Sequence, residues 1–513
     1  MIPSVYQLPQ PGEITVTDRE RAYLDFITET QLLDTALWHR FVRVFQTGAD
    51  AADRGWRGEY WGKMMRGACL VYRCTADPRL YDVLRQTVCD LLSTADADGR
   101  ISTYPWEREC CGWDLWCRKY VLTGMLHFCD ICTDSALTER ILDSMERHLD
   151  CLIARVGPNA GQIKITATSD FWLGVNSCSI LEPVMDLYRR RPQERFLRFA
   201  RYIIGTGGCS DGDLIALALE NKTLPCQYPE TKAYETMSFF EGVLAFYEAT
   251  GEQKYLDAVL RFAEAVFETE ITLIGCAGCT HEQFDHAAIR QTEPSEKVMQ
   301  ETCVTVTWMR LCARLFLRTG NEIYADRVEQ SALNALYGSV NLFAQPFTMP
   351  KSGETVPALP FDSYSPLVMH RRGRDVGGLK AFDDGSFYGC CAAIGAAGLA
   401  VYPLIRPLRK EPATAPTLCE HRLNGCVAFT FGPFVLARDA AKESGDLAAP
   451  VCPLRQGETL CYTLLPCENG EFVRLRLETE RGPVLLTDYA SCGKHWAEND
   501  GPITVWMPTQ RPL

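Results

Sequence analysis

A repeated helix–turn–helix pattern runs along most of the chain and constrains its fold more than any other feature. In each copy an apolar helix ends near an aromatic residue, a short turn follows, and a second helix begins. The copies start about 60 residues apart, which leaves room for two helices and their loops. Gly251 and Gly320 stand where a helix C-terminus favours a left-handed residue. The copies are at 72–81, 128–137, 187–197, 246–256 (FYEATGEQKYL) and 316–325 (FLRTGNEIYA).

These five hairpins supply ten of the helices that we predict. An opening helix over 19–47 and a last helix over about 391–407 bring the total to twelve. If these two helices pack together, the array closes into an (α/α)6 barrel, which places its loops around a central cavity suited to a sugar. The alternative is an open helical solenoid.

The domain organisation follows from the spacing of apolar residues, which changes from a helical period to strict alternation late in the chain. We predict a barrel over residues 18–408, interrupted at about 338–388 by an irregular span rich in Pro and Gly, and then a linker (RKEPATAPT). From 418 to 513 apolar residues alternate, which predicts a small β-sandwich. Residues 1–17 are an extended segment that can add a strand to it. Strands are expected at 427–431, 434–436, 472–477, 483–486 and 503–507.

Charge and composition exclude some classes of function. The 513 residues carry a net charge of −13, which disfavours nucleic acid and anionic membranes as partners. We find neither a signal-peptide pattern nor an apolar run long enough to span a bilayer, so we expect a cytoplasmic protein, with a homodimer left open. Most of the 24 cysteines are expected to be buried thiols, and some cysteine pairs at this density arise by chance.

Four residues form a candidate metal site. Glu301 and Cys303 open the predicted helix ETCVTVTWMRLCARLFL, and Cys390 and Cys391 open the helix CCAAIGAAGLAVYP. A helix N-terminus favours anions and lowers the pKa of a thiol. One carboxylate and three thiolates make a tetrahedral zinc shell, so we predict that these residues bind zinc. The alternative is an ordinary N-terminal carboxylate with three core thiols.

Glu282, in the loop sequence HEQF, is a candidate general acid/base. The alternative is a solvated glutamate. Other residues nearby compete for the roles of proton carrier, namely His281, Asp285 and His286, and of metal ligand, namely Cys276 and Cys279.

Two segments have the composition of sugar-binding surfaces, because aromatic rings stack on sugars and charged groups bind hydroxyls. The first, CGWDLWCRKY, contains Trp113, Asp114 and Lys119, although Trp113 and its neighbour Trp116 can equally be core residues. The second, TKAYETMSFFEG, places Lys232, Tyr234 and Glu235 at the head of a predicted barrel helix.

Several of these motifs together resemble glycoside hydrolase family 127, the β-L-arabinofuranosidase family. ETC followed by a helix and RTGNEIYADRVEQSALNAL resembles the family pattern, as do GCCAAIG and HEQF. The C-terminal LTDYASCGKHWAENDGPITVWMP resembles the family's closing tyrosine-rich strand and its Val-Trp-x-Pro ending. The similarity covers nearly the whole chain.

The resemblance implies a retaining glycosidase with an (α/α)6 barrel. It implies that Cys390 is the nucleophile and Glu282 the acid/base, and that Glu329 lies close to the substrate, with Asn334 at a family asparagine position. It also implies that Glu301, Cys303, Cys390 and Cys391 hold zinc, which keeps Cys390 as a thiolate.

The chain departs from the family in the residues that contact the sugar. The characterised arabinofuranosidases use histidines from two barrel helices, whereas here the corresponding regions read CRKYVLTG and TKAYETMS, where Tyr120 and Lys232 fall. We therefore expect the same chemistry on an L-arabinofuranoside, another furanoside or an acidic pectin sugar. Two other interpretations stay open: an (α/α)-barrel sugar epimerase or uronyl lyase or hydrolase, and a non-catalytic carbohydrate-binding protein with structural zinc.

Overall fold

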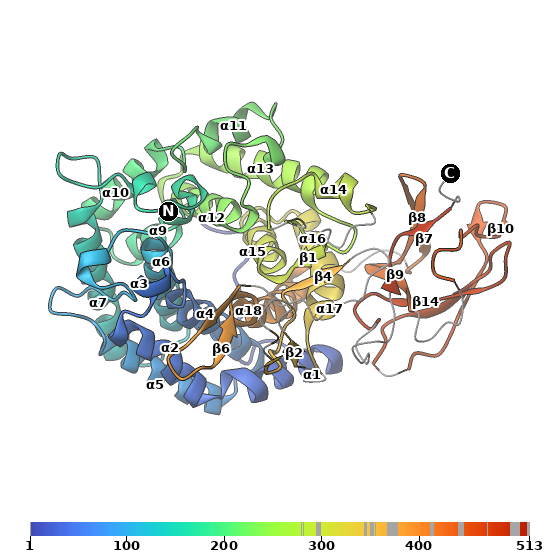
Figure 1. Cartoon of the computed structure of the whole chain (residues 1–513), viewed down its shortest axis with the longest axis horizontal. Coiled ribbons are helices and arrows are strands. Elements are labelled where there is room, and N and C mark those ends of the chain that lie inside the picture. Colours follow the sequence, from blue (N-terminus) through green and yellow to red (C-terminus); the bar gives the residue numbers. More distant parts are fainter. Residues whose placement is uncertain are drawn as a thin grey trace.

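The computed structural model describes residues 2–278, 280, 282–293, 299–342, 346–348, 353, 355–366, 378–410, 415–439, 446–468, 470–492 and 503–509. Helices dominate the chain from Asp18 to Leu408, and strands dominate from Leu418 onward. Figure 1 shows the helices arranged as a ring, with the strands from Leu418 onward gathered beside it.

Six helices of the described chain form the inner ring. Each packs against the next, and the last packs against the first, so the ring is closed (Figure 1). This closure confirms the predicted (α/α)6 barrel and excludes the open solenoid. The inner helices are α4 (Gly58–Thr75), α6 (Asp114–Cys129), α9 (Leu181–Arg190), α12 (Ala233–Thr250), α15 (Thr302–Thr319) and α18 (Cys390–Ile405).

The outer helices alternate with the inner ones along the sequence. Each buries one apolar stripe against the ring, as α10 does with Phe196, Phe199 and Ile203. The five predicted turns all connect an inner helix to the next outer helix. Gly251 and Gly320 end two inner helices at φ of 76° and 68°, as predicted. The outer helices are α2 (Thr35–Thr47), α5 (Pro78–Leu92), α7 (Ser135–Arg155), α10 (Glu194–Gly205), α13 (Gln253–Glu270) and α16 (Glu322–Ser331).

The two terminal helices of the barrel differ from the prediction. The single helix expected over 19–47 is two helices, α1 (Asp18–Ile27) and α2, separated by a π-helical turn. Asp34 starts the second helix, because its side chain accepts a hydrogen bond from the amide of Leu37 at 3.0 Å and caps α2.

The stretch Cys390–Leu408, which contains α18, is long and apolar enough to cross a membrane, contrary to our expectation. However, 83% of its most apolar segment is buried inside the protein.

The N-terminal segment lies across the barrel and not against the strands. The amide of Ile2 donates to the carbonyl of Glu248, and the amide of Tyr6 donates to that of Leu317. Residues 2–17, all of them described, form no strand, so the expected pairing with the β-domain is wrong.

The span that we expected to be irregular contains short strands that position functional residues. The strand β1 (Met299–Glu301) pairs with β4 (Tyr364–Pro366), which puts Glu301 opposite Tyr364. The hairpin of β5 (Leu379–Ala381) and β6 (Phe387–Gly389) leads directly into α18. A further hairpin joins β2 (Phe347–Thr348) to β3 (Thr355–Val356).

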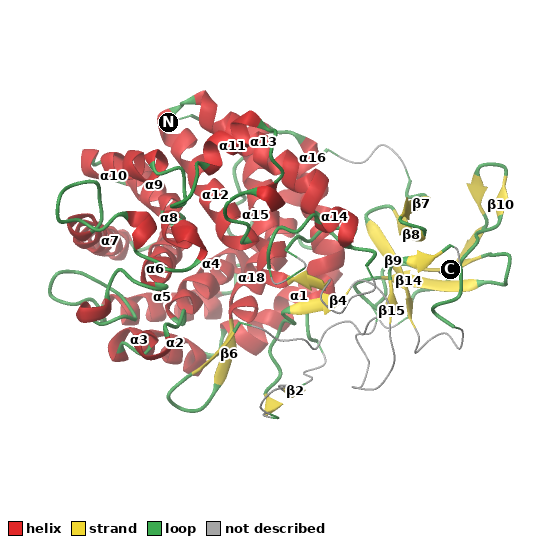
Figure 2. Ribbon diagram, turned by 45° about the horizontal axis from the view of Figure 1, so that its top comes forward, coloured by secondary structure: helices red, strands yellow, loops and turns green. Residues whose placement is uncertain are grey.

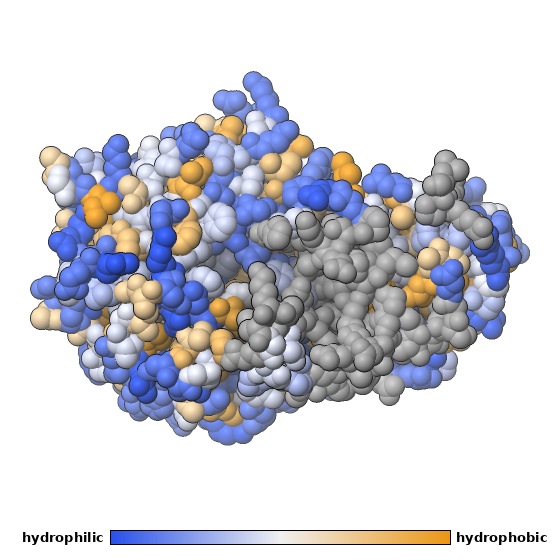
Figure 3. Space-filling view, viewed as in Figure 1, coloured by the Kyte–Doolittle hydropathy of each residue, from blue (hydrophilic) through white to orange (hydrophobic). Residues whose placement is uncertain are grey.

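The C-terminal domain is antiparallel, and Figure 2 shows its strands on one side of the barrel. The strands run in the order β12-β13-β14-β9-β8-β16, with β7 also on β8 and β15 also on β9. Alternate residues enter two apolar clusters, one with Phe429 and Leu436 and the other with Ala428 and Ala437. Among the residues coloured in Figure 3, hydrophilic side chains are spread over the visible face of the molecule, with hydrophobic ones scattered between them. The strands are β7 (Leu418–Leu423), β8 (Cys426–Phe431), β9 (Phe434–Asp439), β10 (Arg455–Gln456), β11 (Thr459–Leu460), β12 (Tyr462–Leu464), β13 (Arg474–Leu477), β14 (Val484–Asp488), β15 (Ile503–Thr504) and β16 (Met507–Pro508).

The expected strands correspond to β8, β9, β13, β14, β15 and β16, whereas β7 and the short strands β10 to β12 were missed. Asn334 ties this domain to the barrel. Its side chain accepts a hydrogen bond from the amide of Val435 at 2.7 Å and donates to the carbonyl of Pro433 at 2.9 Å.

Candidate active site

The four predicted metal ligands converge at the N-terminal ends of two adjacent inner helices. Glu301 and Cys303 lie at the start of α15, and Cys390 and Cys391 are the first residues of α18. Their ligand atoms all lie within 4.8 Å of one another. The Cys391 thiol donates to Glu301 Oε1 at 2.8 Å, and its sulfur is 3.3 Å from that of Cys303. The sequence therefore identified a real three-dimensional cluster.

This Glu/Cys3 cluster is buried and electrostatically crowded. Burial, together with the nearby Glu282 and Cys390, raises the pKa of Glu301 to about 8. Burial likewise raises the pKa of the Cys303 and Cys391 thiols. Hydrogen bonds from those two thiols, together with the nearby lysines, lower the pKa of Cys390. Charging all four groups needs a compensating cation, and one oxygen with three sulfur donors fits zinc.

The β5–β6 hairpin places Cys390 at the head of its helix. The amide of Cys390 donates to the carbonyl of Gly378 at 3.3 Å. Gly378 has a φ of +63°, and a Cβ on it would lie 2.3 Å from the Cys390 sulfur. Only glycine leaves room for the thiol at this position.

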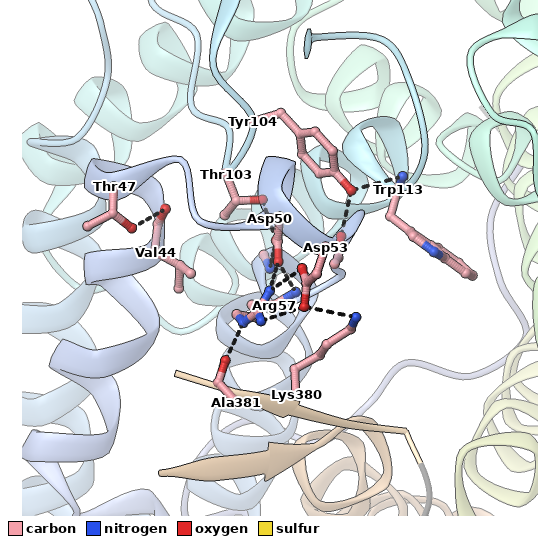
Figure 4. A network of polar contacts seen from close by, with 12 residues as sticks. Val44, Thr47, Asp50, Asp53, Arg57, Thr103, Tyr104, Trp113, Lys380 and Ala381 are labelled. Atoms are coloured by element: carbon pink, nitrogen blue, oxygen red, sulfur yellow. Dashed lines mark hydrogen bonds and ion pairs between the residues drawn. The ribbon is translucent and has the colours of Figure 1, made fainter. Parts of the chain in front are cut away.

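A polar network holds the same hairpin against the barrel (Figure 4). The guanidinium of Arg57 donates to Asp50 Oδ1 at 2.7 Å, to Asp53 Oδ2 at 2.8 Å and to the carbonyl of Ala381 at 2.7 Å. Lys380 also pairs with Asp53, at 3.1 Å. The start of α4 is thereby joined to the strand that precedes Cys390.

Glu282 lies beside the Glu/Cys3 cluster. Its loop runs along the start of α12: the amide of Ala233 donates to the Glu282 carbonyl at 3.0 Å, and the amide of Phe284 donates to the carbonyl of Thr231 at 2.7 Å. The Glu282 carboxylate accepts hydrogen bonds from Lys232 Nζ and the Tyr364 hydroxyl. Its own φ is +63°, a strained conformation for glutamate that is typical of functional sites.

A second buried carboxylate, that of Glu270, anchors the loop after Glu282. Its Oε2 accepts hydrogen bonds from the amides of Asp285 at 3.0 Å, His286 at 2.9 Å and Ala287 at 3.4 Å. Burial raises the pKa of Glu270 to about 7. The loop that carries Glu282 is therefore held in place by hydrogen bonds both at Glu282 itself and at the residues that follow it.

Among the described residues, the other candidate proton carriers and metal ligands of this region lie outside the Glu/Cys3 cluster. Asp285 forms an ion pair with Arg290 at 3.1 Å. The Cys276 sulfur lies 3.2 Å from the Thr272 hydroxyl and, among the described residues, is not part of the metal-type cluster. His281 and Cys279 lie outside the described residues.

A group of buried polar side chains from α4, α6 and α12 lies near the Glu/Cys3 cluster. Lys63 Nζ pairs with Glu59 at 2.8 Å, and the Trp116 indole also donates to Glu59. The hydroxyls of Tyr120 and Tyr234 hydrogen bond to each other. Burial raises the pKa of Glu59 to about 7, and Lys63 opposes this shift. Tyr120 and Tyr234 were predicted from the sequence, whereas Glu59 and Lys63 were missed.

The remaining predicted substrate residues of α6 have other contacts. Asp114 is fully buried and accepts hydrogen bonds from Ser102 and from the amide of Cys110, so it fixes the start of the helix. Trp113 packs against Trp56, with ring centroids 5.9 Å apart. Lys119 lies 4.6 Å from the Trp116 ring, and burial lowers its pKa to about 7.

Glu329 is not brought to the cluster, which corrects its expected place beside the substrate. Its carboxylate accepts a hydrogen bond from the Tyr402 hydroxyl at 2.6 Å and pairs with Arg409 at 2.9 Å. Tyr402 is near the far end of α18, roughly 16 Å along the helix axis from Cys391. Glu329 instead helps to join α16 to the end of α18.

Comparisons with known proteins agree with this architecture. Residues 16–352 match the family model described as beta-L-arabinofuranosidase, GH127 catalytic domain. The structure of a GH127 β-L-arabinofuranosidase from Geobacillus stearothermophilus T6 is 14% identical, with a TM-score of 0.69 over 97% of this chain and 100% of that one. A second GH127 β-arabinofuranosidase structure is 14% identical, with a TM-score of 0.63 over 98% of both chains. No curated protein is significantly similar in sequence. The structural likeness at this identity shows a shared fold.

Proposed function

Because this chain belongs to glycoside hydrolase family 127 and is a glycoside hydrolase, we propose that it is a zinc-dependent retaining enzyme with Cys390 as nucleophile. Glu282 serves as its acid/base. The substrate is an L-arabinofuranoside or a related plant-glycan sugar. The observation that carries this proposal is the convergence of Glu301, Cys303, Cys390 and Cys391 within 4.8 Å, with Glu282 alongside.

The same four side chains would hold the zinc ion. When bound, zinc supplies the positive charge that keeps the surrounding thiols ionised at neutral pH. Burial and the nearby Glu282 and Cys390 raise the pKa of the Glu301 carboxyl group to about 8, so an ionised Glu301 needs a neighbouring positive charge. The ligand types of this cluster and its need for a positive charge therefore both support zinc.

The first half of the reaction forms a bond between Cys390 Sγ and the anomeric carbon. The bond from that carbon to the leaving oxygen breaks, and Glu282 gives its proton to that oxygen. The product is a glycosyl thioether on Cys390 and a free leaving alcohol.

The second half reverses these roles. The Glu282 carboxylate takes a proton from water, the water oxygen bonds to the anomeric carbon, and Cys390 leaves as a thiolate. Two displacements on one carbon retain its configuration. Lys232 and Tyr364 contact opposite oxygens of Glu282 and keep this carboxyl group in place between the two proton transfers.

The site needs reduced cysteines, and no disulfide joins the described cysteines. These observations support a reducing compartment, and we place the enzyme in the cytoplasm.

Two substitutions test the proposal. Cys390→Ser and Glu282→Gln should each abolish release of L-arabinose from an L-arabinofuranoside, while circular dichroism and the thermal midpoint stay close to wild type. Cys89→Ser, at a half-buried thiol of α5, and Glu268→Gln, at an exposed position of α13, are the matched controls and should keep full activity. Full activity in Cys390→Ser or Glu282→Gln would refute the role given to that residue.

A further inference from the structure

Two buried cations in the barrel interior have no counter-ion among the described residues. Arg66, in the middle of α4, is fully buried, and none of its three guanidinium nitrogens has a hydrogen-bond acceptor. Lys119 of α6 is also fully buried, and its Nζ has no acceptor. An arginine stays ionised in proteins, and a buried charge without a counter-ion is strongly unfavourable. These two groups therefore need a partner from outside the chain.

The two cations lie close together, on neighbouring inner helices. The centroid of the Tyr120 ring is 5.5 Å from Arg66 Cζ and 5.2 Å from Lys119 Nζ. The helices α4 and α6 pack side by side (Figure 1), so closely that a Cβ on Gly62 would overlap the carbonyl oxygen of Tyr120. A further donor without an acceptor, the hydroxyl of Thr123, lies one turn after Lys119 on α6. Unpaired donors therefore gather in one part of the barrel interior.

The carboxylates nearest to these cations are compensated by other arginines. Arg310 of α15 donates to Glu241 at 2.9 Å and to Glu182 at 3.0 Å. Arg314, one turn later, also donates to Glu182, at 2.9 Å. Neither carboxylate accepts a hydrogen bond from the two unpaired cations, although both carboxylates act on the pKa of the lysine. The described interior therefore keeps an excess of positive charge where α4 meets α6.

A cavity reaches this region from the end of the barrel that lies opposite the Glu/Cys3 cluster. It has a volume of about 640 Å³ and is lined by the last turns of several inner helices and by the N-terminal segment. Leu70, one turn after Arg66, and Thr123, one turn after Lys119, both line it. Arg310 lines the same cavity. A small ion can therefore enter without passing the Glu/Cys3 cluster.

We propose that Arg66 and Lys119 bind a chloride ion inside the barrel. Their N–H groups and the Thr123 hydroxyl donate to it, which gives these donors a common acceptor. The oxygens Glu182 Oε2 and Glu241 Oε1, which have no hydrogen-bond partner among the described residues, would repel a second negative charge. A monovalent ion therefore fits better than sulfate or phosphate. The ion stabilises the barrel and takes no part in the proposed reaction.

Thermal unfolding of the full-length protein tests this site in solution. Chloride is raised from zero to about 100 mM, with gluconate keeping the ionic strength constant; for a dissociation constant of about 1 mM, the unfolding midpoint should rise by about 2–4 °C. Arg66→Met and Lys119→Met, which put an apolar chain in place of each cation, should lose most of this rise. Two variants at exposed positions, Arg198→Met and Lys254→Met, are the controls and should keep it. Lys254 is matched to Lys119 because its ammonium group also lies against an aromatic ring, 4.7 Å from that of Tyr255.

Bromide, which replaces chloride and scatters anomalously, locates the ion directly. Wild-type crystals grown in sodium bromide should show an anomalous peak within hydrogen-bond distance of Arg66 and Lys119, and this measurement decides the question even where a variant fails to fold. Two results would overturn the inference. The first is a wild-type crystal with no bromide between these two residues. The second is a chloride-dependent rise that is as large in Arg66→Met and Lys119→Met as in wild type, which would mean that water alone satisfies the buried donors.

Discussion

Arg57→Ala should destabilise the protein strongly and disturb the placement of Cys390. The guanidinium makes four hydrogen bonds of 2.7 to 2.9 Å, to Asp50, to both carboxylate oxygens of Asp53 and to the carbonyl of Ala381. Asp50 is fully buried, and burial already raises the pKa of its carboxyl group. Removing one partner of a buried ion pair costs about 3–5 kcal/mol, because the other charge is left without compensation. The β5–β6 hairpin also loses its connection to the start of α4.

The assay is thermal unfolding together with hydrolysis of an L-arabinofuranoside. Arg57→Ala should lower both the unfolding temperature and kcat, and Arg57→Lys should recover only part of each, because an ammonium group cannot reproduce the forked geometry. Arg79→Ala is the matched control: this arginine also pairs with two carboxylates, Asp77 and Glu29, but it is exposed and should matter little. If Arg57→Ala is no less stable than Arg79→Ala, the network does not hold the hairpin.

Two further substitutions test the placement of the catalytic groups. Gly378→Ala should lower kcat at least about tenfold, because its Cβ would lie 2.3 Å from the Cys390 sulfur, whereas Gly385→Ala, with a φ of +78° but nothing within 4 Å, should keep most activity. Equal losses in the two variants would point to backbone strain and not to the thiol contact. Glu270→Ala should lower kcat by a similar factor because the amides of Asp285 and His286 lose their acceptor, while Glu270→Gln keeps one. The pKa of Glu270 is raised from 4.5 to about 7, so between these pH values the folded protein holds a proton on Glu270 that the unfolded chain has lost. The stability that it contributes is therefore present below pH 4.5 and is lost as the pH rises to about 7. The unfolding temperature of wild type relative to Glu270→Gln should fall across that interval, and a constant difference would contradict the shift.

The helical architecture was predictable because its signals are local. The turns after inner helices carry an aromatic residue and, at Gly251 and Gly320, a glycine in the left-handed region. The opening helix was mispredicted because apolar spacing continues through the break, and only the cap at Asp34 marks the new start. The β10 to β12 strands were missed because each is only two or three residues long.

The site was predictable only where several motifs pointed to one place. Glu301, Cys303, Cys390 and Cys391 each follow a short strand segment or begin a helix, and the family resemblance joined them. Tyr364 lies in a span without periodicity, and its place depends on the register of β1 against β4. The helix α4 is buried over most of its length, and charged residues within it were the signal that could have identified its buried ion pair.

The position of Glu329 was predicted wrongly, because closeness in the sequence does not determine closeness in space. Glu329 follows a family-like motif, yet its helix directs it to Tyr402 and Arg409 at the far end of α18.

The zinc content of the purified protein tests the central claim most directly. Wild type and Cys303→Ala are purified under reducing conditions, and metal is measured by mass spectrometry beside circular dichroism. We expect about one zinc ion per chain in wild type, and its loss from Cys303→Ala with the helical signal retained. Well-folded wild type without zinc, or a Cys303→Ala variant that keeps it, would contradict a metal centre built from the Glu/Cys3 cluster.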